Sequence, residues 1–197
     1  MEKKMRDKMK KIIIFGYLII GIIVTGCIRP YLDTNVKTLL DPHYNIGVSK
    51  IIIIAPDMGN LVILESLENS FVSEFAAYNI AAIAGYKIFS PLKSYSPQEM
   101  EALMKQQGID AYLLVEPTPS YMIKDNRIYP YNYSSGYAIE ARLYLRNVSS
   151  AIWEADSLTM YHGGVLGYNS TFQSLAESIV ESYTEDLNNQ KELNQKK

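Results

Sequence analysis

The chain has 197 residues, of which 48% are hydrophobic and 20% charged, and its formal net charge is −2. The first 26 residues hold six basic and two acidic residues, so the other 171 carry 13 Lys and Arg against 19 Asp and Glu. This acidic balance, without a basic stripe, excludes nucleic acid as the expected partner and electrostatic adhesion to anionic lipid. The length is sufficient for one domain with a hydrophobic core.

The N-terminus has the three parts of a secretory signal. A basic start is followed by an apolar run over residues 12–24 and then by Thr25, Gly26 and Cys27. A membrane-spanning helix needs about 20 apolar residues, so this run is too short for a permanent anchor. The sequence therefore predicts a cleavable signal peptide over residues 1–26.

The stretch Val24-Thr25-Gly26-Cys27 resembles the lipobox of bacterial lipoproteins, and Cys27 is the only cysteine of the chain. The resemblance implies that Cys27 carries diacylglycerol and an N-acyl chain such as palmitate, and several acyl chains anchor a protein stably. The alternative is an ordinary buried cysteine in an N-terminal helix. The residue after the cysteine is Ile28, not the aspartate that often retains such proteins at the inner membrane. If the cell has two membranes, this favours the periplasmic face of the outer membrane.

Residues 27–47 include Pro30 and Pro42 and show no periodicity, which predicts a lipidated tether with a span of roughly 25 Å. Lys50–Pro56 is a β-branched run typical of a strand buried on both faces. A helical stripe follows it and is expected to end at Gly85. The apolar positions of this stripe are Leu64, Leu67, Phe71, Phe75, Tyr78 and Ala82.

Tyr86–Phe89 is predicted to form a second, short strand. Ser96-Pro97-Gln98-Glu99 has the pattern of a capping box with proline at the first helical position, so a helix is expected from there to Gly108. Asp110–Glu116 supplies a third apolar strand. With right-handed crossovers, this βαβαβ half predicts a small parallel sheet.

The second half of the chain predicts an antiparallel hairpin and a final helix. Apolar and polar residues alternate over 137–146, as in a strand with one wet face, and Ala151–Ala155 begins the return strand. Ser170–Gln173 has another capping-box pattern. The helix after it has an apolar face made of Phe172, Leu175, Ala176, Ile179, Val180, Tyr183 and Leu187. The polar tail over residues 189–197 is expected to be frayed.

These elements predict one α/β (α+β) domain over residues 48–188 with a mixed sheet. Their order, with the stretches Gln107–Tyr112 and Ala151–Glu154, resembles a group of bacterial envelope lipoproteins. The group includes the curli-secretion-channel lipoproteins and the penicillin-binding-protein activators, whose domains are similar to the N-terminal domain of the Tol-system periplasmic protein. The resemblance implies a fold and a compartment, but fold does not settle function.

Catalysis is not expected from this sequence. The two histidines lie far apart, and the motifs of serine hydrolases, zinc proteases and dithiol sites are absent, so neither a cofactor nor a metal site is predicted. Asp57, Ser90 and Glu116 follow or end the presumed parallel strands, where open α/β sheets bind ligands. The alternative is that these side chains are solvated strand ends. The glycine-rich stretch 162–171 could hold an anion at a helix N-terminus, but it lacks a P-loop lysine and a hinge is the preferred interpretation.

The stretch Tyr121–Tyr137 is rich in Tyr, Pro, Asn, Ser and Gly, a composition typical of adaptable recognition loops. We expect Tyr129, Tyr131 and Tyr133 to contact an envelope protein, a glycan or a second copy of the chain. The alternative is a hairpin tip that packs its tyrosines on its own domain.

Taken together, these features predict a membrane-anchored envelope lipoprotein that is not an enzyme and acts by binding, as an accessory, regulatory or assembly factor. One alternative is a subunit of an oligomeric secretion channel, as the curli-type resemblance implies. Another, from a different class, is an envelope hydrolase. A homo-oligomer is compatible with the binding role and with the channel role.

Overall fold

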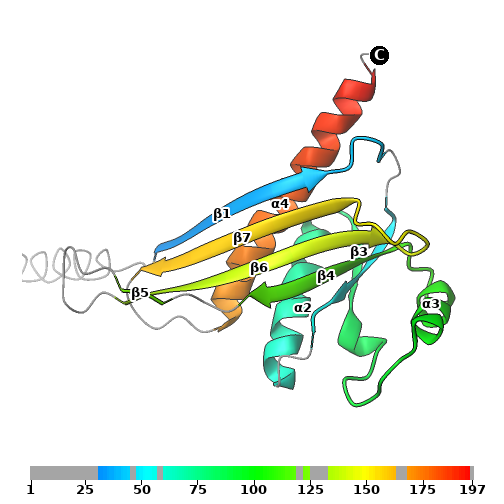
Figure 1. The fold of residues 1–197 in the computed structure, drawn as a ribbon, viewed down its shortest axis with the longest axis horizontal. Helices are drawn as coiled ribbons and strands as arrows, with labels where there is room; N and C mark the ends of the chain where they lie inside the picture. Colours follow the sequence, from blue (N-terminus) through cyan, green and yellow to red (C-terminus); the bar gives the residue numbers. More distant parts are fainter. Residues whose placement is uncertain are drawn as a thin grey trace, which may run out of the picture. The chain divides into compact units, whose positions relative to one another are not determined.

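The computed structural model describes residues 31–44, 48–56, 60–118, 122–124, 133–162 and 168–195. In these ranges the strands form one seven-stranded sheet in the order β1-β7-β6-β4-β2-β3, with β5 paired to β6 (Figure 1). The elements are β1 (Tyr31–Leu40), β2 (Lys50–Ile54), α2 (Leu61–Ala77), β3 (Ala81–Ala84), a 3-10 turn η1 (Gly85–Lys87), α3 (Pro97–Gln106), β4 (Ala111–Thr118), β5 (Met122–Lys124), β6 (Tyr133–Leu145), β7 (Trp153–His162) and α4 (Tyr168–Gln195). From Leu32 onward they belong to one compact unit.

The sheet is mixed, as predicted. Strand β2 pairs in parallel with β3 and β4, whereas β4 pairs antiparallel with β6 and β6 with β7. Ile51, Ile52 and Ile53 of β2 all have 0% exposure, which confirms that this strand is buried on both faces. The βαβαβ half, the antiparallel hairpin and the C-terminal helix are therefore confirmed.

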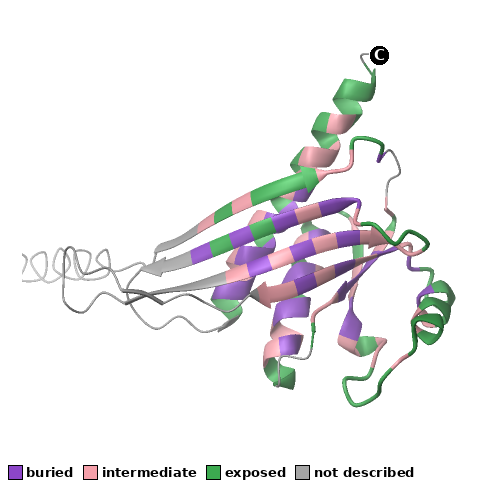
Figure 2. Ribbon diagram, viewed as in Figure 1, coloured by how far each residue is buried: buried purple, intermediate pink, exposed green. Residues whose placement is uncertain are grey.

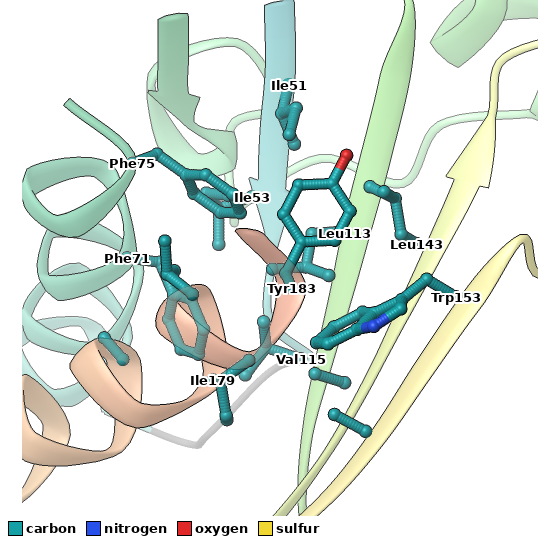
Figure 3. Close-up of a cluster of buried hydrophobic side chains, with 14 of the residues drawn as sticks. Ile51, Ile53, Phe71, Phe75, Leu113, Val115, Leu143, Trp153, Ile179 and Tyr183 are labelled. Atoms are coloured by element: carbon teal, nitrogen blue, oxygen red, sulfur yellow. The ribbon is translucent and has the colours of Figure 1, made fainter. Parts of the chain in front are cut away.

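Helices α2 and α4 cover one face of the sheet and close the main core. Figure 3 shows Phe71 and Phe75 of α2 and Tyr183 of α4 facing Trp153 of β7. The Trp153 ring meets the Tyr183 ring edge-on at 5.3 Å between centroids, and its Nε1 donates to Asp186 Oδ2 at 2.9 Å. Burying aromatic side chains of this size contributes much of the stability of a small core.

Helix α3 packs on the opposite face, beside β2 and β3. A second apolar cluster forms there from Ile52, Met104 and Ile109. The predicted capping box at the start of α3 is confirmed, because Glu99 N donates to Ser96 Oγ and Ser96 N donates to Glu99 Oε2. The serine and glutamate satisfy N–H groups that the first turn of a helix leaves unpaired.

The prediction of a tether over residues 27–47 is wrong for Tyr31–Leu40, which forms edge strand β1 next to β7. Figure 1 shows the two strands running in opposite directions. Thr34 Oγ1 lies 2.8 Å from Thr159 Oγ1, and Val36 and Leu40 pack against the core. A threonine, Thr34, shares the inward side with these two apolar residues, so the apolar periodicity of the strand is weak. The folded domain therefore begins before residue 48.

The predictions for the end of the first helix and for the second strand are also wrong. Helix α2 ends at Ala77, and Asn79 adopts a φ of 60°. This left-handed conformation, which asparagine tolerates better than most residues, turns the chain into β3. Strand β3 is the alanine-rich Ala81–Ala84, whereas Tyr86 and Lys87 of the predicted strand lie in the 3-10 turn Gly85–Lys87. The pairing with β2 overrides the low strand propensity of alanine.

The C-terminal helix is longer than predicted at both ends. It begins at Tyr168, so the pattern at Ser170–Gln173 lies inside it, and it continues to Gln195 instead of fraying after Leu187. Gln190 Nε2 donates to Pro42 O at 3.0 Å, a bond between its later turns and the connection after β1. The predicted apolar face is buried from Phe172 to Tyr183. No helix in the described ranges is long and apolar enough to cross a membrane.

Candidate functional site

Several residues that the sequence singled out lie outside the described residues: Cys27, Asp57, Tyr129 and Tyr131. Tyr133 starts β6, where its backbone pairs with Lys124 of β5. Residues 122–124 and 133–137 of the predicted tyrosine-rich loop are thus backbone-paired strand, although the tip over 125–132 lies outside the described residues. Whether the tyrosines bind a partner stays a prediction. The same holds for the hinge after His162, because residues 163–167 are likewise not described.

The structure does not bring Ser90 and Glu116 into one site. Ser90 N donates to the Tyr95 hydroxyl at 3.0 Å, in its own exposed loop. Glu116 lies within β4 and not at its end, opposite Glu140 of β6. The prediction that Glu116 ends a strand is therefore wrong, and the proposed ligand site loses one of its members.

Glu68 of α2 occupies the place where the parallel strands β2 and β3 end. The residue is 2% exposed, and its carboxylate accepts from Ala55 N at 3.0 Å and from Tyr86 N at 2.9 Å. Burial raises the pKa of Glu68, and hydrogen bonds from the backbone N–H groups of Ala55, Tyr86 and Gly85 oppose that rise. The N–H groups that could bind a ligand here are thus occupied by a side chain of the protein itself.

Gly85 allows this close approach. A Cβ at this position would lie 2.6 Å from the carbonyl oxygen of Ile53 and 3.1 Å from Glu68 Oε1. Only glycine lets backbone segments come this near to each other. Glu68 and Gly85 therefore form a structural junction between α2, β2 and β3.

The part of the sheet left uncovered by helices is a better candidate site. We define the open face as the side chains of β4, β6 and β7 that alternate with the buried ones facing α2 and α4 (Figure 2). It comprises Tyr112, Leu114, Glu116, Ala138, Glu140, Arg142, Tyr144, Glu154, Asp156 and Leu158. The described helices leave it accessible, apart from the contact of Tyr112 with the cluster under α3.

A row of three carboxylates crosses the open face. In the strand register Asp156 of β7 lies opposite Glu140 of β6, which lies opposite Glu116 of β4. Like charges directly across neighbouring strands are destabilising. Arg142 offsets part of this repulsion, because its guanidinium donates to Glu116 Oε2 at 3.0 Å and also to Glu140 Oε1. With Glu154 counted, the open face holds four carboxylates against one guanidinium.

Apolar groups flank the acidic row. The rings of Tyr112 and Tyr144 stack at 4.9 Å with an interplanar angle of 11°, and burial, with the neighbouring Tyr144, raises the pKa of the Tyr112 phenol. Leu158 is 42% exposed on the other side of the row. Negative charge beside apolar and aromatic surface is suited to contact with a partner that has basic and apolar side chains.

The open face offers little to a catalytic mechanism. It contains no serine, cysteine, lysine or histidine that could act as a nucleophile. Among the described residues no group of three or more His, Cys, Asp and Glu side chains could hold a metal ion. The side chains it does present are acidic, aromatic and apolar, with one guanidinium.

No protein-family model matches the chain, and no curated protein matches it. Among solved structures it is similar to PelC from Paraburkholderia phytofirmans, a dodecamer, at 16% identity and a TM-score of 0.47, over 75% of this chain and 95% of PelC. It is similar to lipoprotein GNA1162 from Neisseria meningitidis at 14% identity and a TM-score of 0.43, over 70% and 99% of the two chains. A minor lipoprotein from Acinetobacter baumannii follows at 11% identity and 0.42, over 71% and 94%. At these values the similarities do not identify a family.

The part of the open face that β6 contributes could be predicted from the sequence. The alternation over 137–146 places Glu140, Arg142 and Tyr144 together on one wet face, as the structure confirms. The carboxylate row could not be predicted, because it depends on the register of β4 and β7 against β6. The burial of Glu68 was missed as well, since no local pattern distinguishes it from a solvated helical glutamate.

Proposed function

We propose that the protein is a lipoprotein of the bacterial envelope, anchored through acyl chains on Cys27, and that it acts without catalysis by binding a partner protein on the open face. The observation that carries the binding role is the carboxylate row Asp156, Glu140 and Glu116, which one arginine only partly neutralises. Such a row costs stability in the free protein, and a partner with lysine or arginine side chains would relieve that cost.

The lipobox supports the anchoring part of this proposal. The acidic body cannot bind anionic lipid by charge, so the acyl chains would supply the membrane affinity. The open face would then be presented to partners in the envelope. A regulatory or assembly factor fits this arrangement.

Site-specific photo-crosslinking in cells that make the full-length protein tests the binding role. A benzoylphenylalanine at Leu158 lies at the edge of the open face, whereas one at Leu92, which is 98% exposed, lies in the loop before α3. We expect a discrete crosslinked partner from position 158 and none from position 92. Equal crosslinking from both positions, or none from position 158, would refute the open face as the binding surface.

Charge reversal distinguishes specific recognition of a partner from non-specific adhesion. Replacing Glu154 and Asp156 by lysine should abolish the crosslink from position 158, because the open face would then repel a basic partner. The matched control reverses Glu101 and Glu181, which are exposed on α3 and α4, and should leave the crosslink unchanged. A crosslink that survives the first pair of substitutions would show that charge does not select the partner.

A further inference from the structure

A polar groove lies between the N-terminal halves of α2 and α4, on the side of the sheet away from the open face. Its volume is about 450 Å³, and it is lined by Val62, Glu65, Ser66, Asn69, Ser70, Asn169 and Gln173. Hydroxyl and amide side chains predominate in this lining, and Val62 provides an apolar patch that is 73% exposed.

The side-chain amides of Asn169 and Gln173, both from α4, are each held by a hydrogen bond. In each amide the bond involves either the oxygen or the nitrogen but not both. Ser66 Oγ donates to Asn169 Oδ1 at 2.6 Å, and Gln173 Nε2 donates to Glu74 Oε1. In the described part of the chain no acceptor meets Asn169 Nδ2 and no donor meets Gln173 Oε1. The groove therefore presents an oriented N–H donor and an oriented C=O acceptor.

These two groups lie one helical turn apart, at positions i and i+4 of the same helix, where side chains are neighbours. A ligand amide has the complementary pair, a C=O that accepts and an N–H that donates. The methyl of an acetamido group would add contact with Val62, and ring hydroxyls could donate to Glu65. Amide ends that are already fixed cost little entropy on binding.

The charges around the groove restrict the ligand further. Its lining contains no lysine, arginine or histidine, and Glu65 carries a negative charge. A phosphate or carboxylate ligand would find no cation to pair with. We propose that the α2–α4 groove binds a neutral oligosaccharide that bears acetamido groups, independently of the partner on the open face.

Ligand-observed saturation-transfer NMR on the full-length protein in detergent micelles tests the proposal, with empty micelles as a blank. The probe is tri-N-acetylchitotriose, and maltotriose has similar hydroxyls but no acetamido group. We expect saturable binding of the first at millimolar concentration or below, strongest transfer to its acetyl methyl groups, and at least tenfold weaker binding of maltotriose. Absence of saturable chitotriose binding, or equal binding of maltotriose, would overturn the proposal.

Asn169→Asp is the decisive variant, because it keeps the oxygen that accepts from Ser66 and removes the N–H donor. It should weaken chitotriose binding at least tenfold. The matched control is Asn188→Asp, an exposed position of the same helix with the same change of charge, which should bind as wild type does.

If Asn169→Asp lowers the melting temperature, Val62→Asp provides the second test, because an exposed aspartate in the first turn of a helix is well tolerated. It should also weaken binding at least tenfold. Wild-type affinity in Asn169→Asp, or in Val62→Asp where that variant is needed, contradicts the assignment of the groove.

Discussion

Replacing Glu68 should reveal how much of the fold depends on one buried carboxylate. The side chain accepts hydrogen bonds from the backbone N–H groups of Ala55, Tyr86 and Gly85. Glu68→Ala leaves these donors buried without partners, at a cost of about 1–3 kcal/mol for each group, so we expect a loss of at least about 3 kcal/mol in the free energy of unfolding. Glu68→Gln keeps one acceptor oxygen and should lose about 1–3 kcal/mol at acidic pH.

The pH dependence of these losses has a definite sign. Burial raises the pKa of Glu68 in the folded protein, so the native state holds the proton to higher pH than the unfolded chain does. The stabilisation linked to this proton is fully present below the unfolded pKa, about 4.3. It is lost as the pH rises through the raised folded pKa. Glutamine does not titrate, so the stability advantage of wild type over Glu68→Gln should shrink across that pH window.

Urea unfolding of the full-length protein, followed by fluorescence at several pH values, measures both effects. The signal comes from Trp153, the only tryptophan, which is 1% exposed. Glu65→Gln, on the same helix but only half-buried, is the control and should change stability little. An advantage over Glu68→Gln that grows with pH would mean that the N–H groups favour the ionised carboxylate more than burial disfavours it, and the reasoning would be refuted.

Three further outcomes are expected. Gly85→Ala should lower stability by about 1–3 kcal/mol, because its Cβ would lie 2.6 Å from Ile53 O; an unchanged midpoint of urea unfolding would contradict the close approach. Cys27→Ser should remain without acyl chains and lose its membrane fraction on cell fractionation, whereas an uncut protein that still pellets with membranes would identify the apolar run as the anchor. Replacing Tyr129, Tyr131 and Tyr133 by serine should weaken partner pull-down with an unchanged melting temperature, and a collapse of the fold would favour internal packing of these tyrosines.

The sequence predicted best those elements whose signal is local. Strand β2 is an uninterrupted β-branched run, the start of α3 has a serine and a glutamate three residues apart, and the wet strand β6 alternates strictly. Each pattern follows from the geometry of one element, with no knowledge of its neighbours. These predictions needed only the correct periodicity.

The elements that were missed depend on contacts between distant parts of the chain. The apolar residues of β1 do not alternate regularly, and the strand is held by β7, more than 100 residues away in sequence, as the bond between Thr34 and Thr159 shows. Ala81–Ala84 resembles a helix by composition and becomes a strand only because β2 lies beside it. Glu68 is buried only because two strand ends converge on it. In all three cases contacts with distant parts of the chain decide the local structure, and the local sequence pattern does not reveal them.

The presence of β1 changes what lipidation of Cys27 would mean. With an unstructured tether up to residue 47, the domain could lie roughly 25 Å from the membrane. The structure starts β1 at Tyr31, four residues after Cys27, and an extended chain of that length spans at most about 14 Å. Under the proposed anchoring, the first residues of the sheet would lie close to the lipid headgroups. The folded domain would then follow the anchor directly, without the long flexible tether that the sequence predicts.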